Sequence, residues 1–306
     1  MMLFVPGWFV RVDIDCRTNQ KGKEMQSVRR MCRITAATMM LGTLAAGAIA
    51  AGPLEDRIEA GESIRLGFAA APPWAYQGDD GSPKGFVNGI TIDVLKNMGY
   101  TDIEPVLNDW SGLIPSLRAG RVDIVTGGMY ILKARCENMD FSEPIGAFGD
   151  AFVVPAGNPE NIETYQDLID KDLKMVAPSG YNTLGDAKAA GVPERNIMEV
   201  PGPTEALAAL RAGRVAASAT NVLEAKHGAD SFDGFEMSDP TKFVGREKQV
   251  VGVGFHPDDD EFREKFNEAL KEYLGSEQMM ETVTPDDYIA AYLPTGQTTE
   301  EACKAD

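Results

Sequence analysis

The sequence is poor in the residues that most often bind metals or carry out catalysis. Four cysteines and two histidines occur among 306 residues, and they do not cluster at the spacing of metal ligands. His227 lies in a polar stretch and His256 stands beside Pro257, and neither has an evident triad partner. We therefore expect no metal site and no cofactor, and an enzyme is the weaker hypothesis.

Basic residues are also scarce. The chain has 29 Lys and Arg against 47 Asp and Glu, which gives a formal net charge of −18. Binding of nucleic acid requires clustered positive charge, so this composition argues against a nucleic-acid partner. An acidic surface favours a soluble protein whose copies repel one another, and we expect a monomer.

The N-terminal region has the pattern of an export signal. Three arginines precede residues 34–51, a run that is uncharged and rich in small residues. The run contains Ala48-Ile49-Ala50, an A-x-A cleavage signal. A membrane anchor is the alternative, but the abundant Ala, Gly and Thr make the run only modestly hydrophobic. We expect residues 1–51 to be a leader with a signal peptide and the mature protein to be periplasmic.

The remainder alternates between strand-like and helix-like segments. Apolar runs predict strands at 64–68 and 103–107, and the segments 90–98 and 113–119, each closed by a glycine, predict helices. Such alternation predicts a largely parallel sheet with helices on both faces, which is an α/β fold.

A short repeat indicates two similar lobes. The sequence Leu-Arg-Ala-Gly-Arg-Val occurs at 117–122 and again at 210–215, each time where a predicted helix ends and a strand follows. We assign 62–153 and 250–306 to lobe 1 and 154–249 to lobe 2. The chain then crosses twice between the lobes, and the cleft between them is the natural site for a ligand.

Two cysteines follow the leader. Cys136 lies in lobe 1 and Cys303 in the C-terminal tail. In an oxidising compartment the two are able to form a disulfide that ties the tail to lobe 1.

Residues 120–144, GRVDIVTGGMYILKARCENMDFSEP, are the most informative stretch. An apolar strand and a small-residue turn are followed by Tyr130 and Arg135, at the edge where open α/β sheets hold ligands. A guanidinium is a rigid two-pronged partner for a carboxylate. This stretch resembles the corresponding segment of family 3 solute-binding proteins, which serve ABC importers for amino acids and related zwitterions.

The resemblance implies a type II periplasmic-binding fold, in which each of two lobes is a sheet flanked by helices, and an importer permease as partner. In that family a Thr-x-x-Arg motif supplies the arginine that grips the ligand carboxylate. Arg135 matches the arginine, whereas Leu132 stands in place of the threonine.

Three aromatic residues follow predicted strands. Trp74, Trp110 and Tyr130 each stand where the carboxyl end of a strand meets a loop, so all three can converge on one cleft. Packing beneath a loop is the alternative for any single one of them. Ring faces attract alkylated or delocalised cations, so the set favours a cage for a small zwitterion.

With these residues the resemblance narrows to the binding proteins for ectoine and hydroxyectoine. In that group an aromatic cage holds the cyclic amidinium and an arginine holds the carboxylate. The resemblance implies Trp74, Trp110 and Tyr130 as the cage. An acidic contact is expected near Ala71, where alanine stands, so the cation would rely on the rings or on another carboxylate such as Asp109.

Lobe 2 is expected to close over the ligand with a strand-to-helix turn at 179–183. Its free amides and hydroxyls suit a carboxylate, with Ser179, Asn182 and Thr183 as candidates and a plain helix cap as the alternative. Amino-acid-binding members of the family usually place an Asp near Asn221 to pair with the ammonium group. Asn221 therefore favours a ring-substituted or alkylated zwitterion over a primary amino acid.

Other functions remain as alternatives at this stage. Within binding proteins they are a quaternary ammonium solute of the betaine type and a polar amino acid. Outside them they are a periplasmic dehydratase, which would need a poised acid or base beside the ligand, and a sensory domain that reports to a receptor.

Overall fold

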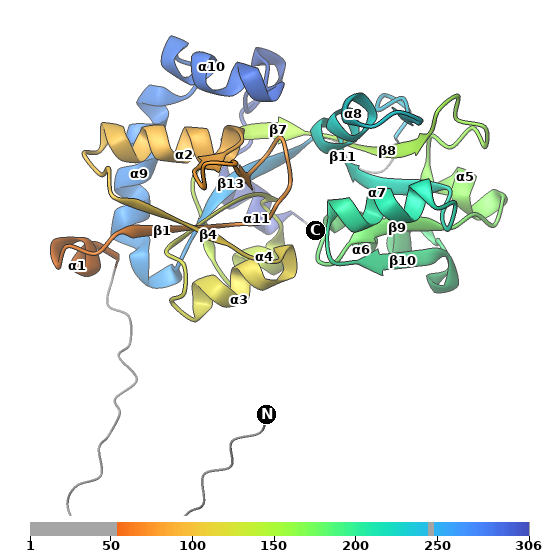
Figure 1. The fold of residues 1–306 in the computed structure, drawn as a ribbon. Helices are drawn as coiled ribbons and strands as arrows, with labels where there is room; N and C mark the ends of the chain where they lie inside the picture. Colours follow the sequence, from red (N-terminus) through yellow and green to blue (C-terminus); the bar gives the residue numbers. More distant parts are fainter. Residues whose placement is uncertain (1–53, 244–247, 306) are drawn as a thin grey trace, which may run out of the picture. The chain divides into compact units, whose positions relative to one another are not determined.

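The computed structural model describes residues 54–243 and 248–305, and the predicted leader lies outside them. These residues form two lobes, each built on its own sheet (Figure 1). Within the described part of the chain, no helix is both long and apolar enough to cross a bilayer.

The first sheet has the strand order β4-β1-β5-β13-β6, and β7 also pairs with β13. Strand β1 is parallel to β4 and β5, whereas β13 runs antiparallel to β5, β6 and β7. The strands are β1 (Ile64–Phe68), β4 (Ile103–Leu107), β5 (Ile124–Tyr130), β6 (Asp140–Phe141), β7 (Gly146–Phe148) and β13 (Gln249–Phe255). A small separate hairpin is formed by β2 (Tyr76–Gln77) and β3 (Pro83–Lys84).

The second sheet has the order β10-β9-β11-β8-β12. Strands β9, β10 and β11 are parallel, and β8 runs antiparallel to both of its neighbours, β11 and β12. Its strands are β8 (Asp150–Pro155), β9 (Met175–Pro178), β10 (Ile197–Val200), β11 (Ala217–Asn221) and β12 (Phe235–Met237). The expected boundary between 153 and 154 falls inside β8, because Phe152 and Val153 pair with Ala219 and Ser218 of β11. An apolar run identifies a buried strand but not the sheet that will contain it.

Helices cover both faces of each sheet, and each face has its own apolar cluster. In lobe 1, side chains of α2, α9 and α10 pack on one face and those of α3 and α11 on the other. In lobe 2, α5 and α6 share one cluster and α7 and α8 the other. The helices are α1 (Leu54–Glu59), α2 (Phe86–Asn97), α3 (Leu113–Arg118), α4 (Lys133–Cys136), α5 (Tyr165–Asp170), α6 (Asn182–Ala190), α7 (Pro203–Arg211), α8 (Val222–Ser231), α9 (Asp260–Tyr273), α10 (Glu277–Val283) and α11 (Thr299–Lys304).

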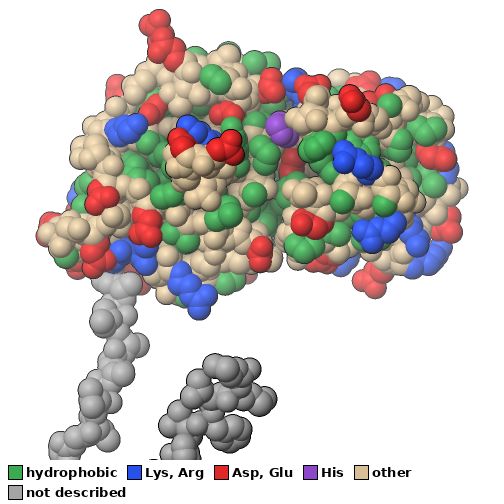
Figure 2. Space-filling view, in the orientation of Figure 1, with side chains coloured by type: hydrophobic (Ala, Val, Ile, Leu, Met, Phe, Trp, Pro, Cys, Tyr) green, Lys and Arg blue, Asp and Glu red, His purple; other side chains and the backbone are tan. Residues whose placement is uncertain are grey.

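The amphipathic pattern of α9 shows how sequence spacing sets this packing. Phe262, Phe266 and Leu270 recur every four residues and are buried against α2 and the first sheet. The charged residues at the remaining positions are exposed, apart from Arg263, which is partly buried. In Figure 2, Lys and Arg side chains lie among Asp and Glu side chains over the visible surface.

A charged cluster holds α1 against the first sheet. Asp123, before β5, forms ion pairs with Arg57 of α1 and Arg65 of β1, and it also accepts the backbone N–H of Arg65 at 2.8 Å. Burial raises the pKa of Asp123, but the hydrogen bonds from Arg65 and Arg57 outweigh it, so its pKa lies below the usual value.

The disulfide expected from sequence is present. Cys136 at the end of α4 is joined to Cys303 in α11, across a sequence separation of 167 residues. Since Arg135 is the neighbour of Cys136, the cross-link anchors the turn that carries the guanidinium.

Replacing Asp123 by Asn should lower the free energy of unfolding by about 2–3 kcal/mol at neutral pH, because two partly buried arginines lose their charge partner. The pKa of Asp123 is lower in the folded state than in the unfolded state, so the ionised carboxylate stabilises the fold above the unfolded-state pKa. This stabilisation is lost as pH falls, so the two proteins should become more equal in unfolding free energy below about pH 4. Urea unfolding at several pH values measures it. Asp172→Asn, which breaks the exposed pair with Arg195, is the control and should change little; an equal loss in both variants would contradict the role of burial.

Removing the disulfide with Cys136→Ser and Cys303→Ser should lower the free energy of unfolding by about 2–4 kcal/mol, because the unfolded chain regains its freedom. Denaturant unfolding with and without reductant measures this loss. Reductant should destabilise the natural chain and leave the double variant unchanged. A natural chain insensitive to reductant under unfolding conditions would refute the expectation.

Candidate functional site

The carboxyl ends of three neighbouring strands bring aromatic side chains of lobe 1 together. Trp74 follows β1, Trp110 follows β4 in a short 3-10 turn (Trp110–Gly112), and Tyr130 is the last residue of β5. Because β4, β1 and β5 are parallel neighbours, their carboxyl ends meet at the same edge of the sheet.

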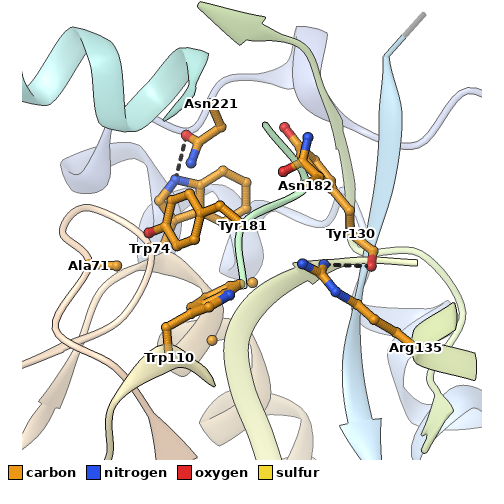
Figure 3. Close-up of a pocket in the computed structure, with 10 residues that line it drawn as sticks. Ala71, Trp74, Trp110, Tyr130, Arg135, Tyr181, Asn182 and Asn221 are labelled. Atoms are coloured by element: carbon orange, nitrogen blue, oxygen red, sulfur yellow. Dashed lines mark hydrogen bonds between the residues drawn. The ribbon is translucent and has the colours of Figure 1, made fainter. Parts of the chain in front are cut away.

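Lobe 2 presents the equivalent edge of its own sheet. Tyr181 and Asn182 follow β9, and Asn221 ends the parallel strand β11. Residues of both lobes line one cavity, with an empty volume of about 340 Å³ that includes its opening to solvent. Its lining comprises Ala71, Trp74, Trp110, Gly127, Gly128, Tyr130, Arg135, Tyr181, Asn182 and Asn221 (Figure 3).

Two glycines allow the indoles to approach the backbone. Gly128 in β5 has a φ of +73°, and a Cβ there would lie 2.3 Å from the Trp74 ring. Gly180 has a φ of +80°, and a Cβ there would lie 3.2 Å from Trp110. Both indoles therefore pack directly on the main chain, which fixes their planes.

Arg135 connects the lobes. Its guanidinium donates to the carbonyl of Tyr130 at 2.9 Å and, across the cleft, to the carbonyl of Gly180 at 3.1 Å. It also lies 5.9 Å from the centre of the Trp110 ring. Burial lowers the pKa of Arg135 to about 10, so it remains a cation at neutral pH.

Trp110 and Tyr181 meet across the lobes. Their ring centres are 4.9 Å apart in an edge-to-face arrangement, and the indole N–H of Trp110 donates to Gly180 O at 3.3 Å. The cavity is thus bounded by ring faces from both halves of the protein.

A buried carboxylate holds two lining side chains from behind. The hydroxyl of Tyr130 lies 3.1 Å from Asp150 Oδ1, and Asn182 donates to Asp150 Oδ2 at 2.8 Å. Burial, together with the charge of Asp150, raises the pKa of Tyr130 well above its usual value. The phenol therefore keeps its proton.

A second buried carboxylate, that of Glu224, holds two other lining side chains, Tyr181 and Asn221. Glu224 Oε1 accepts from the hydroxyl of Tyr181 at 3.2 Å, and Glu224 Oε2 accepts from Thr220 and from Asn221 Nδ2. The amide oxygen of Asn221 in turn accepts the indole N–H of Trp74 at 2.8 Å. Burial raises the pKa of Glu224 to about 7.

The structure brings together six of the eight residues predicted for the site: Trp74, Trp110, Tyr130, Arg135, Asn182 and Asn221. The other two are directed elsewhere. The hydroxyl of Ser179 donates to Glu199 at 2.5 Å, and that of Thr183, which is buried, donates to the carbonyl of Ala219 at 3.2 Å. Both hydroxyls form hydrogen bonds with other residues of lobe 2. The sequence of the turn did not indicate these partners.

Sequence reasoning missed Tyr181, Asp150 and Glu224 as parts of the site. Tyr181 stands inside the predicted 179–183 turn, where only hydroxyl and amide side chains were considered. The spacing of Asn221 and Glu224 is that of a helix N-cap and its third residue, a signal that could have placed Glu224 there. Asp109, considered as the alternative carboxylate, lines an adjacent, larger cleft instead.

Known proteins share this arrangement of two lobes with a cavity between them. Residues 64–284 match the model of the bacterial extracellular solute-binding proteins, family 3. The chain belongs to this family.

Individual relatives agree with that assignment. A probable amino-acid ABC transporter periplasmic-binding protein of Sinorhizobium fredii, y4tE, is 28% identical over 280 residues, which are 89% of this chain and 93% of that protein. The crystal structure of EhuB in complex with hydroxyectoine is 26% identical with a TM-score of 0.74, covering 82% of this chain and 98% of EhuB.

A third similar structure is that of a binding protein described as the precursor of an enzyme. The ancestral amino acid-binding protein AncCDT-1, described as a precursor of cyclohexadienyl dehydratase, is 25% identical with a TM-score of 0.67. The match covers 76% of this chain and 98% of that protein.

Replacing Gly128 by Ala should displace the Trp74 ring and cost about 2–4 kcal/mol of unfolding free energy, from left-handed strain and the clash combined. Gly213→Ala is the matched control, because Gly213 has a φ of +65° and open space around it. It should cost only about 1 kcal/mol. Thermal unfolding and tryptophan fluorescence measure both, and equal losses would show that Trp74 does not pack on Gly128.

Proposed function

We propose that this protein is an extracytoplasmic solute-binding protein that captures a small zwitterionic compatible solute, ectoine or hydroxyectoine, and delivers it to an ABC importer. The observation that carries the proposal is the convergence of one guanidinium and four aromatic side chains on a single small cavity between two lobes.

The carboxylate of such a ligand would bind Arg135. A guanidinium has five N–H donors, and Tyr130 O and Gly180 O account for two of the hydrogen bonds. The remaining donors are available for a two-pronged pair with a carboxylate, which is stronger than a neutral hydrogen bond.

The cationic part would be held by ring faces. Trp74, Trp110, Tyr130 and Tyr181 all line the cavity, and each desolvated face contributes about 1–2 kcal/mol to binding of a soft cation. Three such faces together with the Arg135 pair can reach the ~8 kcal/mol that micromolar binding requires.

The negative charge near a bound cation would come from carboxylates behind the lining. Ala71 contributes only a methyl group to the lining, in place of the expected acid. Asp150 and Glu224 lie behind the lining and hold the hydroxyls of Tyr130 and Tyr181. Their charge favours a cation in the cavity without a direct contact.

Asn221 argues against a primary amino acid as the main ligand. Its amide oxygen already accepts from Trp74 Nε1 and from the backbone N–H of Glu224. A primary ammonium group would find neither a full charge nor a free acceptor there. A betaine-type solute is the next candidate, because ring faces also suit a quaternary ammonium.

A dehydratase would need an acid or base in contact with the ligand. Glu224 has a pKa of about 7, but its oxygens are turned to Tyr181, Thr220 and Asn221. We therefore favour binding without chemistry. Ectoine recovered unchanged after incubation with the purified protein supports this, and its conversion would refute it.

The likeness to EhuB and to y4tE supports the transport role, and the predicted signal peptide supports a periplasmic location. Hinge closure about the two crossings between the lobes would enclose the ligand and present the closed form to the permease.

Trp110→Ala should weaken binding of ectoine by about tenfold or more, because it removes one ring face of the cage and a donor to Gly180 O. Titration calorimetry measures the affinity, after a thermal-shift screen of ectoine, hydroxyectoine, betaines and common amino acids. Phe232→Ala, at an exposed aromatic of lobe 2, is the control and should leave the affinity unchanged. A loss below about twofold would remove Trp110 from the site; tight binding of an ordinary amino acid alone would refute the ligand.

A further inference from the structure

Glu224 is a buried acid that contacts the lining of the cavity without belonging to it. It is the third residue of α8, its side chain is buried, and it lines a separate, mostly apolar cavity with Val153 and Leu207. A buried carboxylate requires partners, and all three of its side-chain partners lie at the edge of lobe 2 that faces the site.

These hydrogen bonds fix the orientation of Asn221. The amide nitrogen Nδ2 of Asn221 donates to Glu224 Oε2 at 3.2 Å, so the amide oxygen must point the other way. There it accepts Trp74 Nε1 at 2.8 Å and the backbone N–H of Glu224 at 2.9 Å. Both lone pairs of the amide oxygen are thus used within the protein.

The same carboxylate fixes Tyr181. The hydroxyl of Tyr181 donates its proton to Glu224 Oε1, which turns the hydroxyl away from the ligand and leaves the ring against Trp110. One side chain thereby sets the positions of two lining residues of lobe 2 and, through Asn221, the indole of Trp74 in lobe 1.

We propose that Glu224 is a specificity-determining positioning residue, which keeps Asn221 turned toward Trp74 so that the site offers ring faces, and no amide acceptor, to the cationic part of its ligand. This inference rests on the proposed function for the ligand class. The positioning itself is independent of which zwitterion binds.

Protonation of Glu224 would disturb this arrangement. Burial raises its pKa to about 7, opposed by hydrogen bonds from Thr220, Tyr181 and Asn221 and assisted by the charge of Asp150. Arg135, near Tyr181, is the cation of the site, and the α7 residues beside Glu224 in its apolar cavity, Pro203, Ala206 and Leu207, carry no charge. Neutral Glu224 loses its attraction for a cation, so affinity for the zwitterion should fall as pH decreases through about 7.

A measurement on the unliganded full chain tests the positioning. The indole N–H resonance of Trp74, assigned by its loss in Trp74→Phe, should move with pH with a midpoint near 7 in the natural chain. In Glu224→Gln it should be displaced and flat between about pH 5.5 and 8.5, because the amide does not titrate. Glu268→Gln, an exposed acid on α9, is the control and should match the natural chain.

Tyr181→Phe provides a second variant in case Glu224→Gln does not fold. Removing a donor to the carboxylate should raise the midpoint of the Trp74 titration. A Trp74 resonance that does not respond to pH near 7 in the natural chain, or that is unchanged by either variant, would overturn the proposal.

Calorimetry with ectoine and with glutamine, which has a primary ammonium group, tests the consequence for specificity. The preference for ectoine over glutamine should decrease in Glu224→Gln. Glu224→Gln should weaken ectoine binding by about fivefold or more and remove its pH dependence, whereas Glu268→Gln should change neither. If Glu224→Gln bound ectoine with the affinity and the pH profile of the natural chain, the role in specificity would be overturned. If the natural chain bound no ectoine at any pH, the proposed ligand would fail, and the Trp74 resonance would still decide the positioning role.

Discussion

The two lobes and the cavity meet at the guanidinium of Arg135. A cation that is partly removed from water needs hydrogen-bond partners, and Arg135 donates to carbonyls in both lobes: Tyr130 O in β5 and Gly180 O after β9. Its own backbone is held from behind, because the disulfide at Cys136 anchors the short helix α4 to α11. The guanidinium is therefore held in one position, and it forms part of the lining of the cavity.

Buried carboxylates position most of the polar lining. Asp150 holds Tyr130 and Asn182, and Glu224 holds Tyr181 and Asn221. The register of the second sheet places the two acids close to the site, since Asp150 lies opposite Asn221 where β8 pairs with β11. These hydrogen bonds hold the rings of Tyr130 and Tyr181 in fixed orientations, which limits the conformational entropy that the two side chains can lose on binding.

Several parts of the site could be predicted because they depend on local rules. Trp74, Trp110 and Tyr130 each follow a strand, and parallel neighbours deliver their carboxyl ends to one edge. Arg135 was found through its spacing from the strand and its resemblance to a family motif. Outside the site, the four-residue spacing of Phe262, Phe266 and Leu270 obeys the same kind of local rule, and these residues form the buried face of α9.

Other parts depend on contacts between segments far apart in the chain. The apolar run at Phe152 was expected to end lobe 1, but its strand pairs with β11 in lobe 2. Ser179 and Thr183 have suitable hydroxyls, yet Glu199 and Ala219 provide them with partners inside lobe 2. Glu224 approaches the site only because α8 begins at the edge where lobe 2 faces Trp74.

The sequence by itself determined the alternation of strands and helices, the pair of lobes and the aromatic residues at strand ends, because periodicity, turn residues and strand direction act over a few residues. It also identified the disulfide, because Cys136 and Cys303 are the two cysteines that follow the predicted leader. Only the tertiary structure decided which polar side chains face the ligand and which are used as internal partners. A donor or acceptor pairs with whatever lies within about 3 Å of it, and that neighbour is set by how distant strands align.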